Sequence, residues 1–302
     1  MAGSERLFDE KMLRRLDQLT LVASKVRAGV LKGERRSTKR GTSLEFADYR
    51  NYARGDDLRR VDWNVFARLE RPFIKLFEEE EDLSVHLLID ASASMDWPRP
   101  GEGPSETHKF RFAQRVMAGL GYVALASGDN LAVTALYGPH LNVTWGPRRG
   151  RGHAIPLLDY MGALQAAGRL DLSGALRDYA LRSTRPGLAF LISDLLSPGW
   201  QDGVAALQGA GHEVAIIHIL SPDEIEPPLV GDLQLVDVET GATSDVTVDA
   251  GMRELYIRRL LAWRDEAAAY CRRRGIHYAT MDTGQSWETL ILFELRRMGV
   301  VK

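Results

Sequence analysis

From residue 83 to residue 302, short apolar runs alternate with longer segments whose apolar residues recur at helical spacing. A strand that reads as a continuous apolar run suits a sheet covered on both faces, and alternation of strands with helices favours parallel pairing. The expected strands are 83–89, 130–137, 141–145, 187–192, 213–220 and 276–281, and the expected helices are 109–127, 153–166, 171–184, 200–210, 250–274 and 287–298. The pattern therefore predicts an α/β fold with a doubly wound, mostly parallel sheet, in which 141–145 is an edge strand.

Two short strand-like runs late in the chain interrupt this alternation. Residues 233–238 and 243–248 flank the sequence ETGA at 239–242, a turn signal of the kind that joins hairpin strands. Residues 73–77 (FIKLF) also read as a strand. We expect the hairpin, at about 232–249, to join 73–77 in a small β annex on the edge of the main sheet.

The segment before residue 83 has a different pattern. Apolar residues recur at helical spacing over 5–28, which predicts an amphipathic helix packed on the body of the protein. A cluster of basic residues follows, and it is either a docking patch for an acidic partner or a solvated loop. The cluster consists of Arg35, Arg36, Lys39 and Arg40. We therefore divide the chain into an N-terminal segment with annex strands, 1–82, and an α/β domain, 83–302.

Composition limits the partners and the compartment. A formal net charge of -2 argues against a protein that binds nucleic acid through a basic surface. The single cysteine, Cys271, cannot form an internal disulfide, which fits a reducing compartment. No run approaches the roughly 20 apolar residues that a membrane helix needs, and the N-terminus is too charged for a secretory signal. We expect a cytoplasmic protein with no membrane insertion and no nucleic-acid partner.

The apolar run at 83–89 is followed by DASASM at 90–95. A strand that ends this way presents one carboxylate and two hydroxyls, from Asp90, Ser92 and Ser94, at intervals of two residues. These are hard oxygen ligands of the type that Mg²⁺ prefers. The alternative is a serine-rich turn between a strand and a helix, with Asp90 as a local cap.

A second apolar strand ends in LISD at 191–194. An apolar run closed by an aspartate also resembles the acidic motif of ATPases. The sequence contains no GxxxxGK[ST] phosphate-binding loop, which argues against nucleotide hydrolysis by this chain alone.

Taken together, DASASM after one apolar strand and LISD at the end of another resemble the von Willebrand factor A-type fold, which is Rossmann-like. In that fold such residues build a metal-ion-dependent adhesion site. The stretch LEFADYR…GDDLRRVDWN…FIKLFEEE, followed by LLIDASASM, more closely resembles the domain of unknown function 58 family, from about Gly41 to Ser197.

The resemblance implies a metal site made by Asp90, Ser92 and Ser94, with Asp194 as a later aspartate ligand. The implied ion is Mg²⁺, or else Mn²⁺ or Ca²⁺. An acidic residue from a partner protein would complete the coordination shell.

One position departs from the family pattern. Family members place a threonine in a GGTDL-like string, and here the string at 168–172 is GRLDL, so Leu170 stands in the place of that threonine. A leucine cannot ligate a cation. Asp171, Ser173 or water could substitute, or the site binds metal weakly.

Three functions remain open from the sequence. The first, which the resemblance implies, is a metal-dependent adaptor working with a MoxR-type AAA+ ATPase, a separate chain, in remodelling or maturation of client proteins. The second is a Mg²⁺-dependent phosphatase or hydrolase that uses Asp90, although Ser92 stands where such an enzyme needs a general acid. The third is a scaffold with a degenerate metal site. We favour the adaptor and expect no catalysis.

Overall fold

The computed structural model describes residues 10–23, 44–53, 61–79, 83–99 and 105–302, which form two compact units. The larger unit combines residues up to 31 with residues 83–302, and the smaller unit spans 32–82. The structure thus divides the chain differently from the expected 1–82 and 83–302, because the N-terminal helix belongs to the larger unit. The basic cluster at 35–40 lies outside the described residues.

The larger unit is built on a six-stranded sheet in the order β10-β7-β6-β3-β4-β5. All neighbouring pairs are parallel except β4 and β5, so β5 is an antiparallel strand, and it lies at the edge of the sheet as predicted. The strands are β3 (Ser84–Asp90), β4 (Asn130–Leu136), β5 (Val143–Arg148), β6 (Leu188–Ser193), β7 (Glu213–Leu220) and β10 (His277–Asp282). The α/β prediction with a doubly wound, mostly parallel sheet is confirmed.

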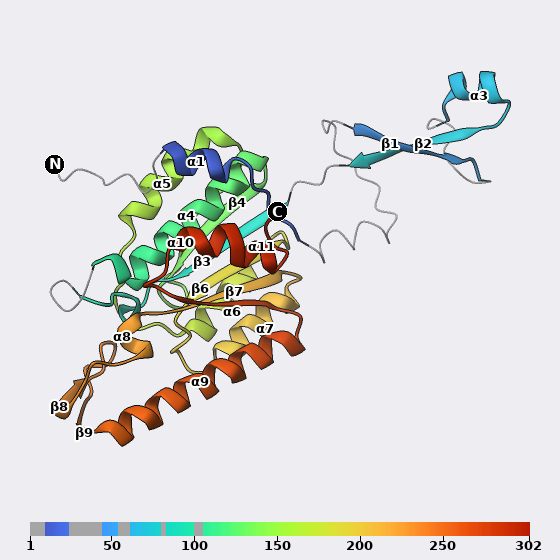
Figure 1. Cartoon of the computed structure of the whole chain (residues 1–302). Coiled ribbons are helices and arrows are strands. Elements are labelled where there is room, and N and C mark those ends of the chain that lie inside the picture. Colours follow the sequence, from blue (N-terminus) through green and yellow to red (C-terminus); the bar gives the residue numbers. More distant parts are fainter. Residues whose placement is uncertain (1–9, 24–43, 54–60, 80–82, 100–104) are drawn as a thin grey trace. The chain divides into compact units, whose positions relative to one another are not determined.

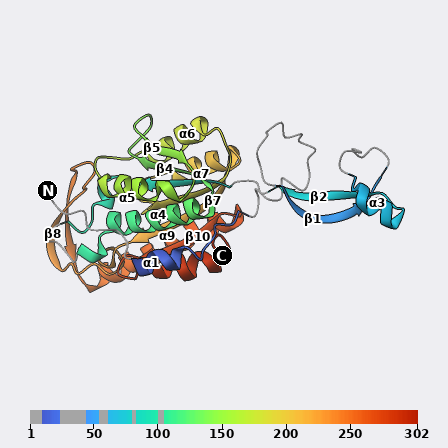
Figure 2. The ribbon, with the colours of Figure 1, turned by 90° about the horizontal axis from the view of Figure 1, so that it is seen from above.

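Helices cover both faces of this sheet (Figure 1), and Figure 2 shows the same elements from above. One core contains side chains of α1, α4, α5 and the C-terminal helical segment, and the other contains side chains of α6, α7 and α9. Strand β3 serves both cores, since Leu87 packs in the first and Leu88 in the second. Each fully buried side chain of this kind stabilises the fold by about 1.5–3 kcal/mol relative to an exposed one.

The helix boundaries follow local signals in the sequence. The helices are α1 (Glu10–Leu16), α4 (Lys109–Ser127), α5 (Ala154–Ala163), α6 (Leu172–Arg182), α7 (Trp200–Gly209), α8 (Pro222–Ile225), α9 (Ala250–Arg273), α10 (Trp287–Thr289) and α11 (Leu295–Arg297), with a π-helical turn at Leu290–Glu294. Helix α4, for example, ends at Gly128, whose φ of 83° gives the left-handed conformation that glycine adopts without a steric cost.

The N-terminal helix is shorter than the 5–28 expected. Within the described residues α1 ends at Leu16, a turn follows at 17–18, and 19–23 are not helical. Leu21 forms a β-bridge with Val301, and the amide of Thr20 donates to the carbonyl of Lys302. Backbone pairing with the C-terminal end therefore replaces helical hydrogen bonds here. The expected packing on the body is present, because Met12 and Leu16 are buried in the first core.

The expected β annex does not form. Strand β2 (Phe73–Glu79) pairs antiparallel with β1 (Leu44–Asn51) in the smaller unit, and the sequence analysis did not predict β1. The hairpin strands β8 (Gly231–Val236) and β9 (Thr243–Val248) pair with each other as predicted, in a separate two-stranded sheet. The prediction that the hairpin joins β2 is wrong.

Among its described residues, the smaller unit contains the helix α3 (Trp63–Leu69). Asp62 caps its start, because its carboxylate accepts hydrogen bonds from the amides of Asn64 and Val65 at 2.9 and 3.2 Å. The GDD triplet at 55–57 lies outside the described residues.

Candidate functional site

Two neighbouring parallel strands end side by side at the centre of the sheet. Asp90 is the last residue of β3 and Ser193 the last of β6, and the register pairs Ile89 with Ile192 immediately before them. The Ser193 hydroxyl donates to Asp90 Oδ2 at 2.6 Å. Carboxyl ends of adjacent parallel strands are where open α/β sheets bind ligands, so this edge is the candidate site.

The loop after β3 folds its two serines back over Asp90. Asp90 Oδ1 accepts hydrogen bonds from the backbone amide of Ser92 at 2.9 Å and from its hydroxyl at 2.6 Å. The hydroxyl oxygens of Ser92 and Ser94 lie 2.9 Å apart. Backbone hydrogen bonds from Ala93 to Gly168, and from Ala167 to Ala91, tie this loop to the one that carries Leu170.

Asp194, directly after β6, completes the group. Its carboxylate accepts hydrogen bonds from the Ser94 hydroxyl and from the Leu196 amide, the latter to Oδ1 at 3.2 Å. Between them, Leu195 has a φ of 56°, a strained value for a residue with a branched side chain. The structure therefore brings together all four side chains singled out by the sequence: Asp90, Ser92, Ser94 and Asp194.

A buried lysine contacts this group. Lys109, the first residue of α4, has a fully buried side chain whose ammonium lies 2.9 Å from Asp194 Oδ2 and 2.6 Å from Glu224 Oε1. Glu224 is fixed by a capping box at the start of α8, where it also accepts a hydrogen bond from the Ser221 amide at 2.8 Å. One ammonium thus faces two carboxylates, and Asp90 adds a third carboxylate nearby.

The pKa values of the two aspartates are shifted in opposite directions. Burial raises the pKa of Asp90 to about 6, the charge of Asp194 adds to this shift, and hydrogen bonds from Ser193 and Ser92 oppose it. Burial would also raise the pKa of Asp194, but the Lys109 ammonium outweighs it and holds that pKa below its ordinary value. The pKa of Lys109 is raised, because its two carboxylate partners outweigh the effect of burial.

The residues near Leu170 do not supply a ligand in the place of the missing threonine. Leu170 is buried, and Asp171 caps α6 by accepting a hydrogen bond from the Gly174 amide at 2.9 Å. Ser173 is half-buried in the first turn of that helix. The described contacts place neither Asp171 nor Ser173 against Asp90, Ser92, Ser94 or Asp194.

Whether these residues fit a divalent cation can be judged from their chemistry. Within the described ranges, no three His, Cys, Asp or Glu side chains are grouped to hold a metal, so a cation here would depend on the serine hydroxyls. Adjacent ligands of an octahedral Mg²⁺ at 2.0–2.1 Å are about 2.9 Å apart, and the Ser92 and Ser94 oxygens are separated by 2.9 Å. Three carboxylates against one ammonium leave a charge that a divalent ion balances. Asp90, Ser92, Ser94 and Asp194 are the side chains that would hold such an ion, and Leu170 offers it no further ligand.

Three residues at the site were not assigned a role from the sequence: Lys109, Ser193 and Glu224. Glu224 is 115 positions from Lys109 along the chain, and no local pattern connects them. A signal for Lys109 does exist, because a cation is unfavourable at a helix N-terminus, and a lysine that opens a largely buried helix needs a carboxylate partner.

The fold and the site define the class of protein: an α/β protein of the von Willebrand factor A-type or Rossmann-like kind, with serine and aspartate side chains at the carboxyl ends of its central strands. The chain belongs to the DUF58 family, described as "Protein of unknown function DUF58", which it matches over residues 48–266.

Relatives of similar length come from mycobacteria. The "Uncharacterized protein Mb1516" of Mycobacterium bovis is 31% identical over 284 residues, covering 92% of this chain and 87% of that protein. The "Uncharacterized protein Rv1480" of Mycobacterium tuberculosis has the same identity and coverage.

Among solved structures, the chain is similar to the conserved hypothetical protein BatB from Bacteroides thetaiotaomicron, at 15% identity and a TM-score of 0.41, covering 72% of this chain and 98% of that one. An aerotolerance-related membrane protein from Bacteroides fragilis has 14% identity and a TM-score of 0.41, with 71% and 99% covered. At these scores neither structure bears on function. In the described part of this chain, no helix combines the length and apolar character needed to span a membrane.

Proposed function

We propose that this chain is a cytoplasmic protein-interaction module that binds an acidic side chain of a partner protein with the help of a divalent cation. The observation that carries the proposal is the meeting of Asp90, Ser92, Ser94 and Asp194 at the ends of β3 and β6. Asp90, Asp194 and the two hydroxyls would hold the cation, and Asp90 would also orient Ser92 by accepting a hydrogen bond from its hydroxyl. Mg²⁺ would supply an electrophilic position that a carboxylate can fill.

The way Asp90 is held supports a binding role rather than a catalytic one. Both of its oxygens accept short hydrogen bonds, from Ser92 and Ser193, and the side chain is 2% exposed. A nucleophilic carboxylate needs an approach path and a nearby general acid, and Ser92 in the corresponding position is a poor acid near neutral pH. We therefore expect no turnover of model phosphate esters.

We further propose that the module works with a MoxR-type AAA+ ATPase in remodelling or maturation of client proteins. This part rests on the family resemblance and on the absence of a phosphate-binding loop from this sequence. A pull-down with and without Mg²⁺, analysed for an AAA+ ATPase and its client, tests it.

A second candidate function has its own supporting observation. The Lys109 ammonium already lies 2.9 Å from Asp194, and Leu170 removes a ligand, so the chain could be a metal-free scaffold in which the lysine supplies the positive charge. The two candidates differ in their response to Mg²⁺.

Calorimetric titration of the full chain with Mg²⁺, Mn²⁺ and Ca²⁺ decides between them. A metal-dependent module gives a saturable heat that Asp90→Ala abolishes and Ser94→Ala weakens. The control Asp202→Ala changes an aspartate whose side chain is 72% exposed on α7 and should leave the heat unchanged. No saturable heat with any of the three ions leaves the scaffold as the function. Where the unmodified chain gives a saturable heat, the same titration of Asp171→Ala and Ser173→Ala shows whether either residue replaces the missing threonine.

A further inference from the structure

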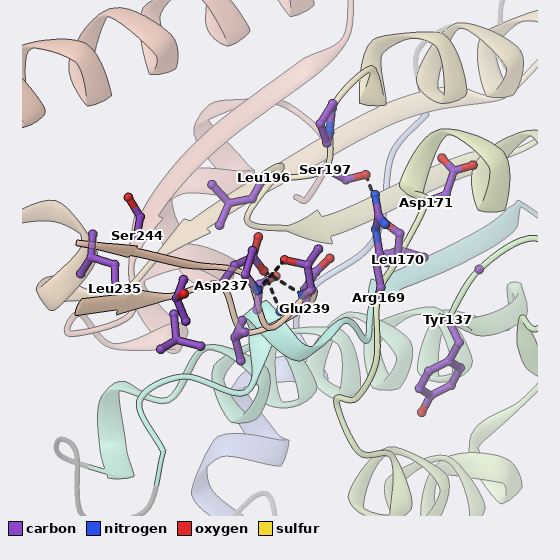
Figure 3. Close-up of a pocket in the computed structure, with 18 of the residues that line it drawn as sticks. Tyr137, Arg169, Leu170, Asp171, Leu196, Ser197, Leu235, Asp237, Glu239 and Ser244 are labelled. Carbon is purple, nitrogen blue, oxygen red and sulfur yellow. Dashed lines mark hydrogen bonds between the residues drawn. The ribbon is translucent and has the colours of Figure 1, made fainter. Parts of the chain in front are cut away.

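A groove opens beside the candidate site, between the loops at the end of the sheet and the hairpin formed by β8 and β9 (Figure 3). Its volume is about 1120 Å³. Ser94 lines it, so the groove begins at one of the four oxygen-bearing side chains of the site. One wall comes from the loops after β4, α5 and β6, and the other from the tip of the hairpin, 235–244.

Both walls expose bulky apolar side chains. Leu141 and Leu196 on the loops are 65% and 51% exposed, and Val236 on the hairpin is 62% exposed. Leu235 lies on the same wall as Val236 and is labelled in Figure 3. Scattered apolar residues are normal on a surface, but apolar residues that face one another across a groove are typical of a protein-binding site.

The charges along the groove are unequal. Asp171, Asp237 and Glu239 are acidic, whereas Arg169 is the one basic residue among the described residues that line it. Asp237 is held in place at the hairpin turn, where its carboxylate accepts hydrogen bonds from the amides of Glu239 and Thr240 at 2.8 and 3.0 Å. The surplus of negative charge complements a partner that carries lysine or arginine.

The hairpin also offers backbone groups for recognition. Within the described residues β8 and β9 pair only with each other, so each strand keeps one edge with unpaired amides and carbonyls. Such an edge accepts an extended segment as an additional strand, in which main-chain hydrogen bonds supply affinity and side-chain contacts supply specificity.

We propose that this groove binds an extended segment of a partner protein that combines bulky apolar side chains with at least one lysine or arginine. The inference rests on the proposed function in one respect: the same segment would present the acidic side chain that the site takes up next to Ser94. The apolar residues would contact Leu196 and Val236, and the basic residue would pair with Glu239 or Asp237. The hairpin is then the element that selects the partner.

The test is selection of peptides from a random dodecapeptide display library on the full chain in the presence of Mg²⁺. We expect enriched sequences to combine bulky apolar residues, a lysine or arginine and an acidic residue. A synthetic peptide from the selection should bind, by fluorescence anisotropy, at least tenfold more weakly to Leu196→Ser and to Val236→Ser. The matched control is Leu181→Ser, which changes a leucine that is 87% exposed on α6, outside the groove.

A charge exchange tests the basic residue. Glu239→Lys should weaken the selected peptide at least fivefold, and a peptide with its lysine or arginine replaced by glutamate should recover binding to this variant. The midpoint temperature of thermal unfolding is measured for each variant. A midpoint equal to that of the unmodified chain confirms that the fold is retained.

The outcomes separate this inference from the proposed function. Failure to enrich any peptide, or peptides whose affinity is the same for the groove variants and the unmodified chain, overturns the groove proposal even if Mg²⁺ binds. Peptides that bind the groove equally well in EDTA support the groove and overturn the metal dependence.

Discussion

The ammonium nitrogen of Lys109 lies 2.9 Å from Asp194 Oδ2, and the lysine side chain has no exposed surface. Removing a charge from water costs several kcal/mol, and this cost is offset only by close partners. Lys109 needs these carboxylate partners all the more at the start of α4, because the N-terminus of a helix carries a partial positive charge that disfavours a cation. Asp194 and Glu224 therefore stabilise Lys109, and Lys109 in turn keeps Asp194 ionised beside Asp90.

The first prediction concerns removal of this charge. Lys109→Met, which keeps the unbranched side chain up to Cε and removes the ammonium, should lower the free energy of unfolding by about 3–5 kcal/mol, because it leaves Asp194 buried without its cation. Urea denaturation followed by circular dichroism measures this. Adding Asp194→Asn to the variant should recover part of the loss.

The control for this prediction is Lys11→Met, at an exposed position of α1, which should change the stability by less than about 0.5 kcal/mol. A loss below about 1 kcal/mol for Lys109→Met would contradict the expected role.

The contacts of Lys109 also show which features of the site cannot be predicted from the sequence. The strands and helices of the larger unit were predictable because apolar runs and helical periodicity are local signals, and β7 and α4 begin and end where expected. Asp90, Ser92 and Ser94 lie in one short loop, so their proximity was predictable as well. The partnership of Lys109 with Glu224 depends on where α8 packs, and no short-range pattern encodes it.

The missed and misplaced strands have the same cause. Strand β1 carries Asp48 and Arg50 and lacks a continuous apolar run, so it does not read as a strand until its pairing with β2 is known. The choice of partner for β2 is also a long-range decision, and the hairpin was wrongly assigned to it. At the N-terminus, pairing of Leu21 with Val301 ends a helical pattern that would otherwise continue.

The second prediction uses a buried histidine at the opposite side of β3 from the first core. Burial, with a smaller effect of the neighbouring His212, lowers the pKa of His86 to about 3 from the ordinary 6.5. Below pH 6.5 the unfolded chain therefore binds a proton that the folded chain does not, and the free energy of unfolding falls as pH falls towards 3. From pH 7 to pH 5 this one group should cost about 2 kcal/mol.

Urea denaturation of the unmodified chain and of His86→Gln at both pH values measures this effect. The unmodified chain should lose about 2 kcal/mol more than the variant between pH 7 and pH 5. Glutamine retains a group that can bond to the Tyr179 hydroxyl, which lies 2.6 Å from His86 Nδ1. Equal losses for the two proteins would show that His86 is protonated in the folded state.

The third prediction follows from the proposed metal site. Leu170→Thr restores a hydroxyl at the position where the family pattern has one and should raise the affinity for Mg²⁺ about tenfold, or ~1.4 kcal/mol. The variant should also be less stable, because Leu170 is 4% exposed and loses apolar burial. Calorimetric titration measures the affinity. Leu196→Thr, at a nearby leucine that is 51% exposed, serves as the control and should leave it unchanged. An unchanged affinity for Leu170→Thr would mean that position 170 does not face the ion.

The fourth prediction tests the close approach of β3 and β6, on which the candidate site depends. A Cβ atom on Gly187, just before β6, would overlap the backbone carbonyl of Ser84 at the start of β3. The carbonyl of Gly187 also accepts a hydrogen bond from the Glu213 amide at 2.9 Å, so the chain cannot move aside freely. Gly187→Ala should therefore lower the free energy of unfolding by about 1–3 kcal/mol.

Gly209→Ala is the matched control, because Gly209 is the last residue of α7 and has open space around it. That substitution should raise stability by up to about 1 kcal/mol. Urea denaturation of both variants measures the difference, and equal stabilities would mean that the two strands are not held as closely as the structure describes.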